Sequence, residues 1–575
     1  MYSLRFSFFL SLVLFFSLFI SLYPSITGQA IQRTPQSITL PCGASITANT
    51  TLSGDIICSS VPYTFVLSIN QPDVTLDCRG HRIANIGNIP WGINVNSPRV
   101  TIKNCIIENF TWGISVYSNA HQSTLEYNTL RFNIQGISLS SWQNFVSSNI
   151  FVNNTSALFG GRLSQFIANS IFGGSSGMAL DSQHIVKHNS FYAVPTAITT
   201  NGNISLYYNN TFVGFGIVGI SLGGNYNIIS KNTFINYSTP VSFSQYSSYN
   251  TFTENIGFGT GFGLSINGRN HIVTHNILHG PGTRGVHLSK ASSTTLLNNT
   301  LLDFSTGIYL ISSNFNTLRS NILLSTSSDI RLSRSHHNAI SLHSSSSPIP
   351  NGLELTDSYY TSVFNNIFAN KIYCFNLGNS SYTTLSSNQC LDSKTGAEIR
   401  SSSHSVFSNN IFSNYDSSGF RVYSYGGYPV SFNLSFVFNC LKDSTGSPFY
   451  FSSMRDNTIA SNIMRNLTGS GVYLSYNTLR NKVYNNYFVG NAIDGKDEFG
   501  TNFWNTTVSP GQNIIGGSYF GGNFWQNYSG VDVNGDLLGD TLVPYTSQGN
   551  IISGGDYHPL LQTTPLPQPI FPFVC

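Results

Sequence analysis

The part of this chain that most resembles a ligand site lies near its C-terminus. Residues with side-chain oxygens stand at positions 1, 3, 5 and 9 of one loop: Asp532, Asn534, Asp536 and Asp540. EF-hand-like loops place Ca²⁺ ligands at this spacing. Two positions depart from the pattern, because Leu537 replaces the expected glycine and Val543 the expected acid. The four residues are candidate calcium ligands, and the alternative is a turn whose side chains cap backbone amides.

Acid–base chemistry would require clustered carboxylates beside a basic residue. The 575 residues include only 23 acidic and 26 basic ones, so clusters are rare. Three groups occur: Asp329 with Arg331 and Arg334, Glu354 with Asp357, and Asp494 with Lys496, Asp497 and Glu498. None carries a recognisable motif of pectate lyases, polygalacturonases or alginate epimerases, and such groups more often form solvated turns. We therefore assign no catalytic residue from the sequence.

The candidate residues above must be positioned by a repeated structure, and an asparagine that recurs every 20 to 23 residues indicates its kind. Apolar or aromatic residues stand three places before it and, with one exception at Gly257, two places after it. A fixed period of this length is typical of stacked repeats. The recurring asparagines are Asn128, Asn149, Asn169, Asn189, Asn210, Asn232, Asn255, Asn276, Asn299 and Asn321.

Short β-branched and aromatic runs separated by Asn, Ser and Gly predict strands and turns rather than helices. Strands that recur once per unit in one direction must stack in parallel. We predict an all-β, right-handed parallel β-helix of roughly seventeen coils, on the order of 80 Å long. The asparagines would form an inner ladder, each binding its own turn and the next coil. The register loosens after Asn321, where we place Ser344 in the ladder, and resumes at Asn366.

The ends of a solenoid need cover, because open strand edges and apolar rungs would otherwise meet solvent. We expect residues 31–60 to form an N-terminal cap, 61–499 the β-helix, 500–563 a closing segment that contains Trp504 and Trp525, and 564–575 a proline-rich tail. Residues 1–30 have the composition of a signal peptide, with Arg5 before an apolar run and a small-residue cleavage site. The alternative for this segment is an uncleaved anchor.

The eight cysteines are not spaced as in a metal site. They could form disulfides, which is consistent with export to an oxidising compartment. Cys42 and Cys58 bracket a short segment, and Cys78 and Cys105 fall in corresponding places of neighbouring coils, so these four are disulfide candidates. We expect no membrane span in the mature chain. Candidate glycosylation sites are Asn49, Asn109, Asn154, Asn203, Asn236, Asn298, Asn433, Asn466 and Asn527.

Two stretches add a family resemblance. The segment Gly522-Asn523-Phe524-Trp525, followed by Asp532, Asp536, Gly539-Asp540 and Asp556-Tyr557-His558-Pro559-Leu560, is similar to the closing segment of many secreted, mostly archaeal proteins. Thr75 to His81 resembles the coil that opens such domains. The chain thus resembles the NosD-type periplasmic copper-binding β-helix family of the pectate-lyase-like superfamily.

That resemblance implies copper, but the residues favour absent or weak binding. Cu(I) sites prefer clustered Met and Cys, and the 4 methionines are dispersed. His188 and His275 share one column but stand four coils apart, about 19 Å. His271, His275 and His279 lie on strands, which do not bring residues i and i+4 together.

The formal net charge of +3 and the 9% of charged residues exclude broad electrostatic recognition of nucleic acid. We interpret the chain as a secreted or cell-surface β-helix without catalytic activity, structural, adhesive or glycan-binding, with a polysaccharide or surface glycan as its partner. One alternative is a polysaccharide lyase or hydrolase, which would place convergent charged residues on adjacent coils. The other is a copper-handling accessory protein. No cofactor is assigned beyond the candidate calcium.

Overall fold

The computed structural model describes residues 36–60, 64–348, 350–424, 430–561, 569–570 and 575. The signal peptide predicted for residues 1–30 lies outside these ranges, as does most of the predicted tail. Every regular element in the described residues is a β-strand, and no helix there is long and apolar enough to cross a bilayer.

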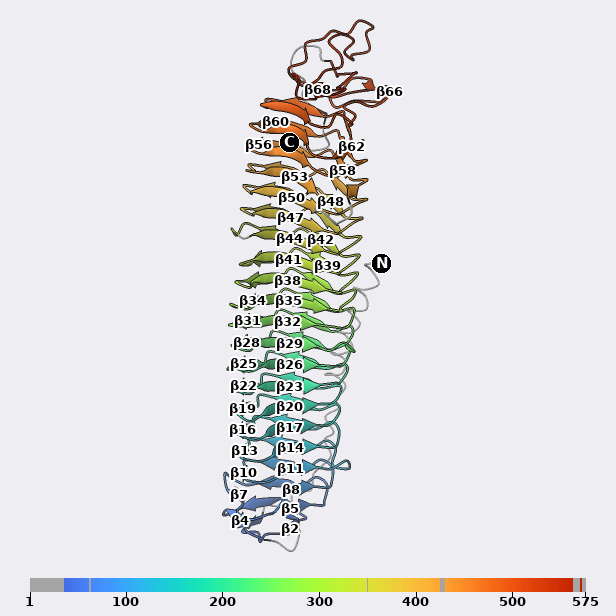
Figure 1. Ribbon diagram of the computed structural model, residues 1–575. Helices are drawn as coiled ribbons and strands as arrows, with labels where there is room; N and C mark the ends of the chain where they lie inside the picture. Colours follow the sequence, from blue (N-terminus) through green and yellow to red (C-terminus); the bar gives the residue numbers. More distant parts are fainter. Residues whose placement is uncertain (1–35, 61–63, 349, 425–429, 562–568, 571–574) are drawn as a thin grey trace.

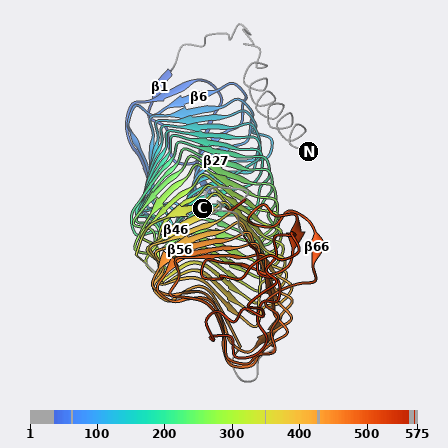
Figure 2. The same ribbon diagram turned by 90° about the horizontal axis from the view of Figure 1, so that it is seen from above.

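Each coil consists of three short strands joined by tight corners. One example is the coil of β12 (Thr124–Glu126), β13 (Thr129–Arg131) and β14 (Gln135–Leu139). Each strand pairs in parallel with its equivalent in the next coil, so three long sheets run along the rod. Figure 2, seen from above, shows the coils lying over one another. The prediction of an all-β, right-handed parallel β-helix is confirmed.

The rod is longer than the sequence predicted, because each sheet contains 21 strands rather than seventeen. Strands β1 (Gln36–Ile38) to β4 (Ile56–Cys58), in the segment expected to be only a cap, pair within the three sheets. At the other end, β68 (Phe524–Trp525) pairs with β64 (Tyr487–Val489). Segments expected to cover the ends therefore also contribute coils.

The three sheets are named by their first strands. Sheet A begins with β1, sheet B with β2 (Ala44–Ile46) and sheet C with β4. The later strands of sheet B are β35 (Arg284–Ser289), β38 (Thr306–Ile311), β41 (Ser328–Ser333), β44 (Asn351–Thr356), β47 (Tyr373–Gly378), β50 (Thr395–Arg400), β53 (Ser418–Tyr423), β57 (Ser447–Phe451), β61 (Ser470–Leu474) and β65 (Ile493–Asp497).

The interior is one continuous apolar core with an asparagine ladder at a corner. All ten periodic asparagines are at most 1% exposed. Asn232 Oδ1 accepts hydrogen bonds of 2.9 Å from the backbone and side-chain nitrogens of Asn210, and Asn232 Nδ2 donates to Tyr207 O at 2.9 Å. The residue before it, Lys231, has φ 55°. The ladder thus satisfies buried amides at a corner that needs left-handed backbone.

The ladder differs from the prediction at one coil. His343, not Ser344, takes the asparagine place: its backbone nitrogen donates to Asn366 Oδ1 at 3.0 Å, and its Nδ1 lies 3.2 Å from Asn321 O. Ser344 is exposed on β43 (Ser344–Ser345). An imidazole nitrogen can bond a backbone group as an amide does, so a search for Asn alone missed it.

The structure adds a serine ladder that sequence reasoning missed. Each hydroxyl accepts a hydrogen bond from the backbone nitrogen of its equivalent one coil earlier, at 3.0 to 3.2 Å. Serine is frequent throughout this chain, so the spacing alone did not separate these residues from solvent-exposed ones. The ladder consists of Ser313, Ser335, Ser358, Ser380, Ser402 and Ser431.

The C-terminal segment lies over one end of the rod (Figure 1). Trp504 and Trp525 are buried beneath it. Asp556 accepts hydrogen bonds from Trp525 Nε1 at 2.8 Å and from Asn523 N at 2.7 Å, and complete burial raises its pKa to about 7. Asn523 also ends the asparagine ladder, because its Oδ1 accepts from Asn486 N at 3.1 Å.

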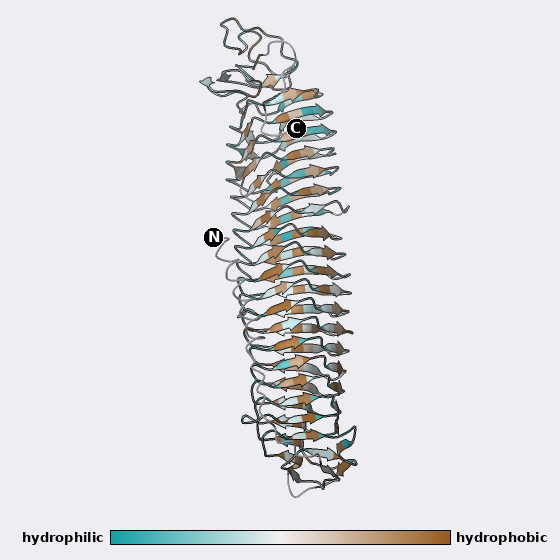
Figure 3. Ribbon diagram, turned by 180° about the vertical axis from the view of Figure 1, so that it is seen from behind, coloured by the Kyte–Doolittle hydropathy of each residue, from teal (hydrophilic) through white to brown (hydrophobic). Residues whose placement is uncertain are grey.

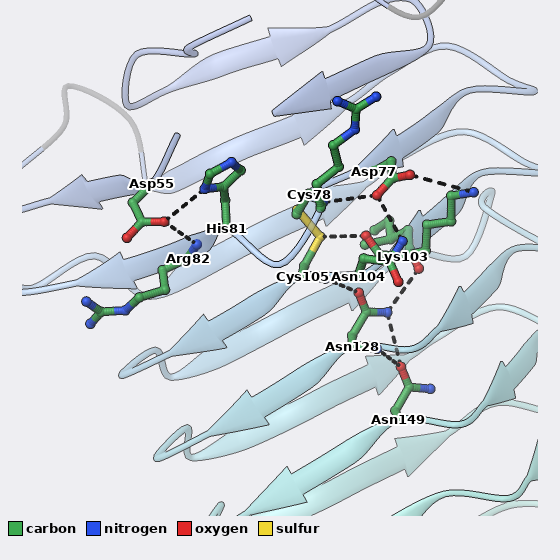
Figure 4. The surroundings of a disulfide bond; sticks show 12 residues. Asp55, Asp77, Cys78, His81, Arg82, Lys103, Asn104, Cys105, Asn128 and Asn149 are labelled. Carbon is green, nitrogen blue, oxygen red and sulfur yellow. Dashed lines mark hydrogen bonds and ion pairs between the residues drawn. A yellow bond between two sulfur atoms is a disulfide. The ribbon is translucent and has the colours of Figure 1, made fainter. Parts of the chain in front are cut away.

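Four disulfides join all eight cysteines. Both candidate pairs are present, Cys42–Cys58 and Cys78–Cys105. Figure 4 shows the second pair beside the first rungs of the asparagine ladder. The other two are Cys374–Cys390 and Cys440–Cys575, and the latter holds the final residue against a coil 135 positions earlier.

Candidate functional site

The outward face of sheet B changes character at β35. From there to β65, one column carries charged, aromatic or amide side chains on ten consecutive strands in register. We call this column the sheet B stripe. It consists of His287, Tyr309, Arg331, Glu354, Asn376, Glu398, Arg421, Tyr450, Tyr473 and Lys496.

Local sequence explains why these side chains face out. In β38 the burial order places Gly307 and Ile308 inside, Tyr309 outside and Leu310 inside again. In β38 the stripe residue therefore follows a Gly-aliphatic pair, and in the other strands it follows the two inward residues at the same place. Figure 3, the view from behind, shows brown segments beside paler or teal ones along the strands of the rod.

A polar network occupies the middle of the stripe. Arg331 Nε lies 3.6 Å from Glu354 Oε2. Glu398 lies between two guanidinium groups, with Arg400 Nε at 3.7 Å and Arg421 Nη1 at 3.8 Å. The first ion pair joins the coils of β41 and β44, and the second group joins those of β50 and β53. Between them, Arg400 Nη2 donates to Asn376 Oδ1 of β47 at 2.8 Å.

Glu398 is the most buried acid of this network, at 4% exposure. The Tyr423 hydroxyl donates to Glu398 Oε1 at 2.8 Å, whereas Oε2 receives no hydrogen bond in the described structure. Burial and the adjacent Glu398 charge raise the pKa of Tyr373. Buried polar atoms are normally hydrogen-bonded. Among the described residues, Oε2 has only the ion pair with Arg421 Nη1 at 3.8 Å, so it could also accept a hydrogen bond from a ligand hydroxyl.

Cations lie over aromatic rings at both ends of the network. The Arg284 guanidinium is 4.6 Å from the Tyr309 ring centre, and Lys496 Nζ is 4.3 Å from that of Tyr473. Burial, followed by the charge of Arg284, lowers the pKa of His287 to about 4. His287 is therefore neutral at neutral pH.

The earlier half of the same column is chemically different. From β8 (Trp91–Val95) to β32 (Phe262–Ile266), it carries no charged residue. Charge is scarce in this chain, so its gathering on the later half is a feature of that surface. The earlier residues are Asn94, Ser115, Ser138, Phe159, Ala179, Thr199, Ser221, Ser242 and Ser265.

The structure separates the acid–base groups suggested by the sequence. Asp329 points inside while Arg331 points outside, so Arg331 meets Glu354 of the next coil instead. Asp494 and Asp497 are buried, whereas Lys496 and Glu498 form a surface pair at 2.9 Å. The clusters seen in sequence are thus not clusters in space. Each stripe residue follows two inward residues of its strand, and a search for charged or aromatic residues at that place would have located the stripe.

The candidate calcium residues lie in an exposed loop, where their oxygens accept hydrogen bonds from the loop backbone. Asp532 accepts from Gly535 N at 2.6 Å and Leu537 N at 2.8 Å, and Asp540 from Val533 N at 2.7 Å. These bonds lower the pKa of Asp532. Within the described ranges, no three His, Cys, Asp or Glu side chains are grouped for a metal ion. These hydrogen bonds are those expected of a capping turn, and the calcium ligands stay a prediction.

Copper does not fit the described residues. Met178, Met454 and Met464 are fully buried in the core, and every cysteine is in a disulfide. His275 contacts Thr274 and Asn298 rather than another metal-binding side chain. No ligand set suited to Cu(I) or Cu(II) is therefore assembled in the described part of the chain.

One glycosylation candidate is wrong. Asn154 is 2% exposed, and its Oδ1 accepts from Asn133 N at 3.0 Å within an inner ladder. A glycan there would require the corner to unfold. The remaining candidates are partly or fully exposed and stay predictions.

A model of the NosD family, described as periplasmic copper-binding protein, matches residues 259–375 and 344–530. No curated protein matches the chain. Among solved structures, it is similar to a PL6 alginate lyase in complex with a trisaccharide, at 14% identity over 56% of this chain and 80% of that one, with a TM-score of 0.31.

Two further similar structures are a tailspike protein of E. coli bacteriophage HK620 and the periplasmic alginate epimerase AlgG. The tailspike is 13% identical over 78% of this chain and 73% of its own, with a TM-score of 0.18. The epimerase is 9% identical over 68% and 84%, with a TM-score of 0.23. At these values the likenesses do not identify an activity.

Proposed function

We propose that this protein is an exported β-helix that binds a polysaccharide chain along the sheet B stripe. The observation that carries the proposal is the set of ten consecutive, in-register polar or aromatic side chains in a chain with only 9% charged residues. Stacked strands repeat every ~4.8 Å. An extended polymer parallel to the rod would therefore meet a new side chain at each coil.

The chemistry of the stripe suits a sugar polymer. Hydroxyl groups can pair with Asn376, with Oε2 of Glu398 and with guanidinium groups, while Tyr450 and Tyr473 offer aromatic surface to the C–H faces of sugar rings. The stripe and its flanks contain five cations and three acids, a net charge of +2. The cations are Arg284, Arg331, Arg400, Arg421 and Lys496, and the acids are Glu354, Glu398 and Glu498.

Export is part of the proposal. All eight cysteines are joined in disulfides, which persist in oxidising compartments.

Affinity electrophoresis tests binding. The purified chain would be run through gels that contain alginate, polygalacturonate, xylan or no polymer. We expect retardation by at least one polymer, and its loss in Arg331→Ala/Arg421→Ala. The matched control is Ser221→Ala/Ser242→Ala in the earlier half of the same column. Retardation by none of the polymers, or equal retardation of both double variants, would contradict the proposal.

Polysaccharide hydrolysis is a second candidate, favoured by one observation. Glu354 and Glu398 point from the same face two strands apart, about 10 Å between their backbones, and inverting glycosidases hold their carboxyl groups ≈ 6.5–9.5 Å apart. Release of new reducing ends by the wild type, but not by Glu398→Gln, would support hydrolysis. Binding without product release would leave the protein a binding module.

A further inference from the structure

A charged pair lies inside the rod, behind the stripe. Lys371 Nζ is 3.0 Å from Asp329 Oδ2, and both side chains have no exposed surface. Asp329 is in β41, and Lys371 precedes β47 by two residues. The coil that contains β44 lies between them, so the pair connects two coils that are not neighbours.

The fold does not require an acid at this position. By the strand register, the equivalents of Asp329 in the coils before and after are Gly307 and Gly352. The carboxylate thus replaces a glycine that packs against neighbouring backbone elsewhere in the rod. A buried carboxylate is a costly group in an apolar core, and its equivalent near the end of the rod is the buried Asp494 of β65.

Burial penalises the charged form of both partners. Lys371 Nζ donates to Ser345 Oγ at 2.9 Å and to Ser347 O at 2.7 Å, whereas neither oxygen of Asp329 receives a hydrogen bond of good geometry. Burial raises the pKa of Asp329 to about 6 and lowers the pKa of Lys371. A buried ion pair must also offset the desolvation of two charges.

We propose that Lys371 and Asp329 condense spontaneously into an isopeptide bond. The lone pair of the uncharged amine attacks Cγ of the protonated carboxyl group and forms the C–N bond. The Ser345 hydroxyl passes a proton from this nitrogen to the departing hydroxyl, the C–O bond breaks, and one water leaves. No oxidant, reductant or further reactant is consumed. The product is a neutral amide, which removes two charges from the core.

The bond would span the coil where the asparagine ladder changes to His343. That coil has the short strand β43, which contains Ser345, and Ser347 follows two residues later. A covalent link between the coils on either side would hold them together even when the intervening coil opens.

Mass spectrometry of the reduced, deglycosylated wild-type chain tests the proposal. Trypsin would normally cut after Arg331, Arg334 and Lys371. Acylation of Lys371 blocks the last cut, so we expect residues 335–394 joined to residues 320–331, lighter than their sum by one water. Recovery of linear peptides that end at Lys371, with residues 320–331 separate, would overturn the proposal without any variant having to fold.

Two controls define the mechanism. Lys371→Arg should yield only linear peptides. The exposed pair Lys496 and Glu498, with atoms 2.9 Å apart, should remain uncondensed, because solvent keeps both groups charged. A bond at this exposed pair as well would show condensation during handling and count against the proposal. Ser345→Ala should give a smaller linked fraction shortly after synthesis.

Discussion

The two halves of sheet B bury similar inward side chains but carry different outward side chains. Before β35 and after it, strands bury two inward residues at the same place, and the asparagine ladder continues through both halves with one substitution, His343. Outside, small uncharged residues give way to guanidinium, carboxylate and phenol groups. In a solenoid the inward residues define the coil, so the outward residues can differ without altering the fold.

The largest expected effect tests whether the asparagine ladder contributes equally to stability in the two halves. Asn232→Ala in the first half and Asn388→Ala in the second should each lower the free energy of unfolding by about 1–3 kcal/mol, because each leaves buried amides without partners. Both asparagines accept from the preceding ladder residue at 2.9 to 3.0 Å. Denaturant titration measures the cost. Costs that differ by more than about 1 kcal/mol would show that the halves are not equivalent.

A change of pH should affect two places in the rod differently, because His184 in the first half and Asp494 at the far end titrate in opposite senses. Burial lowers the pKa of His184, in the first half, to about 4. The unfolded chain then binds more protons than the folded one between about pH 6.5 and pH 4. Stability near His184 should therefore fall as the pH is lowered through this range.

Asp494, at the far end, should behave in reverse. Burial raises its pKa from 3.8 to about 6, so between these values the folded chain binds more protons, and stability there falls as the pH rises. Hydrogen exchange at pH 4.5 and 7, corrected for intrinsic rates, should show β65 better protected at the lower pH and β21 (Ile185–Lys187) at the higher. Parallel changes in both strands would contradict this.

A smaller effect separates binding from stability. Arg421→Ala should weaken polysaccharide binding about tenfold, ~1.4 kcal/mol, because its guanidinium holds Glu398 and faces solvent. Its free energy of unfolding should change by less than about 0.5 kcal/mol. Ser221→Ala, from the earlier half, should change neither. A large loss of stability in Arg421→Ala would mean that the stripe supports the coils.

The smallest effect concerns the acidic loop beyond the later half. Asp532 and Asp540 already accept hydrogen bonds from loop amides, so a chelator should shift the melting temperature by less than about 1 °C. A drop of several degrees that added Ca²⁺ reverses would instead support the prediction that Asp532, Asn534, Asp536 and Asp540 are calcium ligands.

The fold could be predicted from the sequence because the residues that define each coil recur at a fixed interval and point inward. Asn at a fixed interval with apolar residues on both sides has few explanations, and the structure has the expected ladder. The coil count was low because strands such as β1 and β68 lie outside the regular asparagine series. His343 was missed because an imidazole replaces the amide by its hydrogen bonds and not by its residue type.

The site was harder to predict because neighbours in space are about 22 residues apart in sequence. Arg331, Glu354 and Glu398 share no residue type, and only their common position after an inward pair of residues connects them. Charges close in sequence were misleading, since regular alternation would place Asp329 and Arg331 on one face. In β41, however, Asp329 and Ile330 both point inward, and this break in the alternation leaves Arg331 outside.

The identical inner register of the coils also bears on how such a chain can change during evolution. Duplication of one coil of about 22 residues would lengthen the rod by ~4.8 Å and leave every inner ladder intact. Inserted before β35, it would carry the stripe further from the first coil without altering a residue of it. Inserted between β41 and β50, it would separate Arg331 from Glu398. Duplication of a coil would therefore be tolerated in the half before β35, whereas in the later half it would disrupt the stripe and be subject to selection.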